Sequence, residues 1–194
     1  RRRGRRDGAS APHPRVEVSV PEGAGLRCAL VSAEQDEPLL GTAPEASSFL
    51  LVEVRGSWAA KILASEQLSP AVKAFLAAVE SQHKGLRLQF IRAPRRSRGP
   101  IAVYLCHVGN EGGAVSRLEL ESLDEVPSVD VGAWLTHGTL PGAVPETEPL
   151  TLVCAHGRRD ACCALLGVPL YDALVAGKAA RTGDELPTVW QASH

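Results

Sequence analysis

The chain has 194 residues, a formal net charge of −1, 44% hydrophobic residues and 22% charged residues. This composition is typical of an ordinary globular protein, and its charge balance gives no reason to expect a specific nucleic-acid partner. The apolar runs are much shorter than the roughly 18 residues that a membrane-spanning helix needs, and the chain does not open with a signal peptide. We therefore expect a cytoplasmic protein without a membrane segment.

Residues 1–15 combine repeated arginines with turn-forming residues and contain no periodic apolar positions. Such a segment cannot bury enough apolar surface to fold, so we expect a disordered basic tail. A solvated end accounts for the basic run better than a nucleic-acid site does, because no aromatic residues accompany it. The chain contains no methionine, including at position 1, and stops abruptly at His194, which suggests a fragment of a longer product.

Residues 16–138 are predicted to form an N-terminal unit. A helix is expected from about residue 69 to residue 79, capped by Ser69 and with Pro70 at its first position. Apolar runs predict strands at 49–54, 86–91, 101–107 and 115–120, and a short helical segment at 122–126. A glycine-rich turn between the last two strands predicts a hairpin. This order of elements is that of a thioredoxin-like unit, although other α+β topologies share it.

Residues 139–149 form a proline-rich connector, and residues 150–194 are predicted to begin a second, incomplete unit. Its expected elements are a strand at 150–155, a helix at 161–176 and a strand at 188–193. Pro169 should kink or split the helix, because proline removes one intrahelical hydrogen bond. The predicted fold class is α/β, with two thioredoxin-like units that have mixed sheets.

Five cysteines are an odd count, and they are more consistent with ligands or redox thiols than with a disulfide framework. Cys28 and Cys106 lie in apolar settings, where cysteine usually serves as a small buried hydrophobe. The remaining three cysteines, Cys154, Cys162 and Cys163, surround a predicted strand-to-helix turn.

The C-terminal cysteines are placed for metal or redox chemistry. Asp160 is a good N-cap for the predicted helix, and the positive end of the helix dipole should help Cys162 and Cys163 to ionise. Cys154 ends one strand and His194 ends the next, and ligands gather at the carboxyl ends of strands in α/β sheets. We therefore expect the functional site at this edge.

Several stretches resemble the sucrase/ferredoxin-like family of thioredoxin-like ferredoxins, from about Leu26 to the last residue. They are Arg27-Cys-Ala-Leu30, Gly41-Thr-Ala-Pro44, Leu50-Leu-Val-Glu53 with Trp58 close behind, Cys154-Ala-His-Gly-Arg-Arg-Asp-Ala-Cys-Cys163 and Val189-Trp-Gln-Ala-Ser-His194. The resemblance implies a [2Fe-2S] cluster held by two cysteines nine positions apart and by a His-x-x-x-His motif. Cys154, Cys163 and His194 match this pattern, and the second histidine would fall four residues past His194.

A cluster with two histidine ligands implies an electron carrier with a redox partner protein. Imidazoles in place of two thiolates lower the negative charge on one iron and raise its reduction potential, as in Rieske centres. Arg158 and Arg159 are candidates for the partner-docking surface, or they are solvated loop charges. The chain offers no convincing pair of carboxylates around a sugar site, so we do not expect a glycosidase.

The same residues are compatible with three alternatives to the cluster. Cys162 could replace Cys163 as a ligand or be a buried thiol, although the family spacing favours Cys163, and His156 is either beside the cluster or structural. A zinc site would use Cys154, His156, His194 and either Cys162 or Cys163, although this spacing is unusual for structural zinc. A thiol-based redox protein would use Cys154 or Cys163 as its nucleophile, although no Cys-x-x-Cys pair is present. A binding domain without a cofactor is the third alternative.

Overall fold

The structure is a computed structural model that describes residues 31, 34–36, 45–96, 98–108, 113–179 and 188–193. The predicted basic tail, Cys28 and His194 lie outside these residues. Within them, seven strands form one mixed sheet in the order β5-β4-β3-β1-β2-β7-β6. The strands are β1 (Ser48–Glu53), β2 (Leu86–Arg92), β3 (Ile101–His107), β4 (Ala114–Leu120), β5 (Val144–Glu146), β6 (Thr151–Cys154) and β7 (Val189–Ala192). The predicted mixed α/β class is confirmed.

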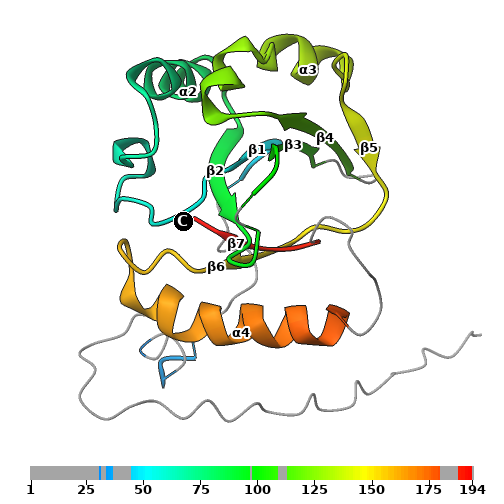
Figure 1. Ribbon diagram of the computed structural model, residues 1–194. Helices are drawn as coiled ribbons and strands as arrows, with labels where there is room; N and C mark the ends of the chain where they lie inside the picture. The colour runs from blue at the N-terminus through cyan, green and yellow to red at the C-terminus, as the bar shows by residue number, and fades with distance from the viewer. Residues whose placement is uncertain are drawn as a thin grey trace, which may run out of the picture.

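Helices lie on both sides of this sheet (Figure 1). The α-helices are α2 (Pro70–Gln82), α3 (Val131–His137) and α4 (Ala161–Ala179), and two 3-10 helices are η1 (Ile62–Ala64) and η2 (Leu123–Ser128). Helices α2 and α3 cover one face, whereas α4 lies on the other side, beside β6 and β7 (Figure 1). No helix among the described residues is long and apolar enough to cross a membrane.

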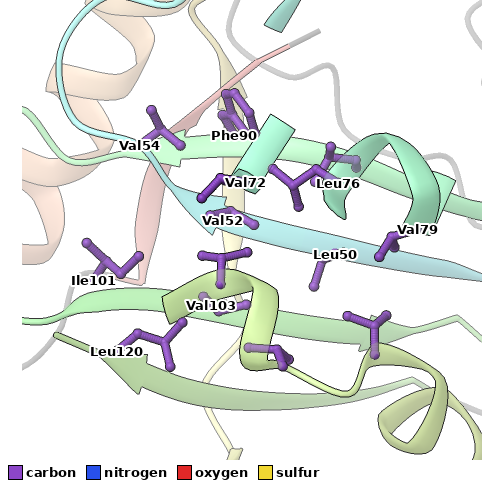
Figure 2. Close-up of a cluster of buried hydrophobic side chains, with 14 of the residues drawn as sticks. Leu50, Val52, Val54, Val72, Leu76, Val79, Phe90, Ile101, Val103 and Leu120 are labelled. Carbon is purple, nitrogen blue, oxygen red and sulfur yellow. The ribbon is translucent and has the colours of Figure 1, made fainter. Parts of the chain in front are cut away.

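Helix α2 forms as the sequence predicts. The Ser69 hydroxyl accepts a hydrogen bond from the Val72 amide, and Pro70 occupies the first turn, where no amide partner is needed. Val72, Leu76 and Val79 are buried on one face of the helix. These side chains lie over Leu50, Val52 and their neighbours in the sheet (Figure 2). The main hydrophobic core therefore lies between α2 and the first strands.

The two predicted units share one sheet. Strand β7 pairs antiparallel with β2, with Ile91 opposite Ala192 and Arg92 opposite Gln191. Ser193 extends this connection, because its amide donates to the Phe90 carbonyl and its hydroxyl accepts from the Phe90 amide. Strands β6 and β7 are parallel neighbours. The segment predicted as the connector 139–149 contains β5, which pairs with β4.

Helix α4 is not split at Pro169, although a split is one of the two outcomes that the sequence predicts for this proline. It runs as a single helix from Ala161 to Ala179 with Pro169 inside it. Pro169 is exposed, as are Leu165 and Leu170 on either side of it. The carbonyl group that loses its partner can therefore bond to water, which reduces the cost of the missing hydrogen bond.

Candidate metal centre

The candidate site is built where β6 ends. Cys154 is the last residue of β6 and lies opposite Ala192 of the parallel strand β7. After Cys154 the chain turns tightly, because the His156 carbonyl accepts hydrogen bonds from the amides of Arg159 and Asp160. Helix α4 then begins at Ala161. The predicted strand-to-helix turn is therefore present, with Cys162 and Cys163 in the first turn of the helix.

Two glycines allow α4 to approach the end of β6 closely. A Cβ atom on Gly167 would lie only 1.9 Å from the Cys154 carbonyl oxygen, and one on Gly157 would lie 2.5 Å from the Ala164 Cβ. Both distances are far below normal contact, so larger residues would push the helix away. The close approach brings the first turns of α4 to Cys154. It thereby brings together cysteines that are nine residues apart.

Asp160 holds the first turn of the helix and adds a carboxylate to the thiols. Its Oδ1 accepts a hydrogen bond from the Cys162 amide at 3.2 Å, and its carbonyl accepts one from the Cys163 amide at 3.1 Å. One ligand atom from each of Asp160, Cys162 and Cys163 lies within 4.8 Å of the others. The predicted N-cap thus has a second property that the sequence did not reveal, because it lies among the candidate metal ligands.

The pKa of the Cys163 thiol is raised above its ordinary value. Burial is the largest cause, followed by a hydrogen bond shared with Cys154 and by the negative potential of Cys154, Cys162 and Asp160. The prediction that this thiol ionises easily is therefore wrong for the metal-free chain, because these effects outweigh the helix dipole. A bound cation would lower the pKa of this thiol instead, since it stabilises thiolates directly.

His156 is buried and connects the site to the N-terminal part of the chain. Its Nε2 atom is hydrogen-bonded to the Ala59 carbonyl at 2.8 Å. Its ring meets the Trp58 ring edge to face, with 5.8 Å between the ring centres. Ligation of a metal by Nε2 would break the bond to Ala59, and neither ring nitrogen of His156 lies in the group of donor atoms formed by Asp160, Cys162 and Cys163. This arrangement favours the structural role over the zinc-ligand role for His156.

Trp58 lies between His156 and a half-buried cation that the sequence did not reveal. The Arg92 guanidinium stacks 4.5 Å from the centre of the Trp58 ring, and its Nε donates to the Gln191 side chain. Burial lowers the pKa of Arg92. Arg158 and Arg159, by contrast, are exposed in the turn before α4. No local sequence signal marks Arg92, because its partners come from distant segments.

The fold and the site together define a mixed α/β protein with a candidate metal-binding group of cysteines and one carboxylate. The chain matches the sucrase/ferredoxin-like family over residues 39–194, and it therefore belongs to that family. No curated protein matches the chain, and no solved structure matches it either. The resemblance seen in the sequence is thus confirmed at the level of the family.

Proposed function

We propose that this protein transfers single electrons through a [2Fe-2S] cluster. Its proposed ligands are Cys154 and Cys163 on one iron and, on the other, His194 and a histidine four residues further on. A cluster of this type takes up and releases one electron without bond-making in a substrate. The observation that carries the proposal is the contact between the Cys154 and Cys163 thiols, together with membership of the family.

The described residues fit the cysteine half of such a site. Two thiolates on one iron must lie side by side, and the thiols of Cys154 and Cys163 already share a hydrogen bond. Cys154 is fixed by the pairing of β6 with β7, and Cys163 by the first turn of α4. Ligands held on rigid elements need little rearrangement when a metal binds. Ala192 lies opposite Cys154, and His194 follows Ala192 by two residues in the sequence.

The surroundings suit a centre that exchanges electrons with a redox partner protein. Exposed Arg158 and Arg159 lie between the two cysteine ligands in the sequence, where they would face an acidic surface on the partner. Charges at such a position chiefly accelerate association and set its orientation. A reducing compartment such as the cytoplasm would keep the ligand thiols available.

We also propose that the chain is built from two thioredoxin-like units, and the order of the first four strands supports this. Strands β1 and β2 are parallel and joined by α2, and the antiparallel pair β3 and β4 continues the sheet in the order β4-β3-β1-β2. This is the order expected for a parallel crossover followed by a hairpin. Strand β6, helix α4 and strand β7 would begin the second unit in the same way.

The test is an optical spectrum with iron and acid-labile sulfide analysis on protein purified without oxygen. We expect visible charge-transfer bands, with two irons and two sulfides per chain, in a chain that continues past His194. Cys154→Ser and Cys163→Ser should each abolish the bands, whereas Cys162→Ser should retain them. A colourless protein, or bands that depend on Cys162 and not on Cys163, would refute the ligand assignment.

A thiol-based redox activity is the second candidate, because the contact between Cys154 and Cys163 also suits a disulfide. Against it, the raised pKa of Cys163 leaves little of the thiolate that attacks in thiol exchange. Reversible loss of two titratable thiols without any iron, in wild type but not in Cys154→Ser, would favour this candidate over the cluster.

A further inference from the structure

Asp160 and Cys162 have no place in the proposed cluster, yet they share a small volume with Cys163. The three ligand atoms lie within 4.8 Å of one another. In a tetrahedral zinc site with ordinary bond lengths, two sulfurs lie about 3.8 Å apart, and a sulfur and a carboxylate oxygen about 3.6 Å apart. The three donors therefore need to move by only about 1 Å to surround one ion.

Cys154 lies outside this group of three and is the candidate fourth donor, from a different element. Its thiol hydrogen-bonds to that of Cys163, and both residues are half-buried, while Cys162 is buried. Three thiolates and one carboxylate carry the same formal charge as the four thiolates of a common structural zinc site. The donor set combines soft sulfur with one oxygen, which suits zinc better than a hard cation such as magnesium.

We infer that Cys154, Asp160, Cys162 and Cys163 form a site for a single zinc ion. The site differs from the zinc alternative seen in the sequence, because it uses Asp160 and both helix cysteines and needs neither His156 nor His194. Zinc binding would release the thiol protons to solvent. The site itself does not depend on the cluster. Competition between the two metals for Cys154 and Cys163, however, rests on the proposed function.

The test uses Co²⁺ as a visible substitute for zinc in the reduced, metal-free chain. We expect one Co²⁺ per chain, with sulfur-to-cobalt charge-transfer bands and the intense visible bands of a tetrahedral site, all removed by added Zn²⁺. Cys162→Ser and Asp160→Asn should each weaken Co²⁺ binding at least about tenfold. Asparagine also caps helices well, so Asp160→Asn should preserve the first turn of α4.

Cys106→Ser is the matched control, because it also removes one thiol but lies in β3, in the antiparallel part of the sheet. It should bind Co²⁺ like wild type. Circular dichroism verifies folding of each variant, and Cys162→Ala replaces Cys162→Ser if serine is not tolerated at this buried position. Equal binding by Cys162 variants and Cys106→Ser would overturn the inference. It would equally be overturned if His194→Ala abolished binding while Asp160→Asn did not.

These outcomes are separate from those of the cluster test. A chain that binds Co²⁺ through Asp160 and Cys162 but never assembles a cluster would refute the electron-transfer proposal alone. The zinc site alone would be refuted by two results together: the chain assembles a cluster that Cys162→Ser does not affect, and the metal-free chain binds no Co²⁺. If both metals bind, added Zn²⁺ should lower the yield of cluster in wild type and much less in Cys162→Ser.

Discussion

The two parts of the sheet differ in how they are held together. The part that carries α2 is packed on a large apolar cluster from β1, β2, β3, α2 and α3. Beside α4, the corresponding cluster among the described residues contains only Val153, Tyr171 and Val189, with Val175 at its edge. The first part has the burial needed for stability, whereas the second holds the thiols of the candidate site. The site region therefore depends on the stable part through the pairing of β7 with β2 and through the His156 contacts.

The largest expected effect comes from damage to the stable part. Leu76→Ala removes a fully buried side chain from α2 and should lower the free energy of unfolding by about 2–5 kcal/mol. Because β7 pairs with β2, metal binding at the site should be lost in the same transition. Denaturant unfolding followed by circular dichroism and by Co²⁺ absorbance measures both.

The control for Leu76→Ala is Leu170→Ala, at a position of α4 that is 53% exposed. Its effect on stability should stay within about 0.5 kcal/mol. Two separate unfolding transitions, of which Leu76→Ala shifts only one, would mean that the site region is stable by itself and does not depend on the part that carries α2.

A smaller and more local effect is expected at the contact between α4 and β6. Gly167→Ala would place a Cβ atom 1.9 Å from the Cys154 carbonyl oxygen, so the helix must move and carry Cys163 away from Cys154. We expect a cost of about 1–3 kcal/mol and a clear loss of Co²⁺ affinity. Calorimetry and the Co²⁺ titration measure the two effects.

Gly177→Ala is the control in the same helix, because among the described residues no atom beyond the adjacent backbone of α4 lies within 4 Å of the position that its Cβ would take. It should stabilise α4 by up to about 1 kcal/mol, since alanine favours helix, and leave metal binding unchanged. If Gly167→Ala also bound metal like wild type, then close packing of α4 on β6 would not be what brings the cysteines together.

The sequence predicted the stable part better than the site region. Ser69 and Pro70 marked the start of α2, and β3 was predicted with its observed bounds, because caps and apolar runs are local signals. Helix α3 and strand β5 were missed, since one has seven residues and the other three. Such short elements are set by tertiary packing, as at the buried Trp134 of α3.

The candidate site was predicted in part, for the same physical reason. The placement of Cys154 and Cys163 around a strand-to-helix turn could be predicted from the sequence, because it depends on neighbouring residues. The direction of the Cys163 pKa shift could not be predicted from the sequence, because it depends on burial and on several nearby groups at once. The pairing of β7 with β2 and the stacking of Arg92 on Trp58 join segments that are distant in the sequence. No local sequence pattern predicts such contacts.

The smallest effect is expected from Cys106, a thiol that packs in the sheet and lies outside the candidate site. Burial raises the pKa of Cys106 from 9.0 to about 11, and this residue packs against the cluster that includes Tyr104 and Trp190. Between these two pKa values the unfolded chain loses the proton while the folded chain keeps it, so stability must fall as pH rises. The loss cannot exceed about 1.4 kcal/mol per pH unit from this one group.

Cys106→Ala should remove this part of the pH dependence, measured as the difference in unfolding free energy between wild type and variant at pH 9 and at pH 11. Bound zinc should not change that difference, because Cys106 lies outside the proposed zinc site. The same metal should reverse the contribution of Cys163, whose thiolate it would hold, so that this thiol no longer favours unfolding at high pH. A Cys106 difference that disappears when zinc binds would show that this thiol also takes part in metal binding, and the division between a packing thiol and site thiols would then fail.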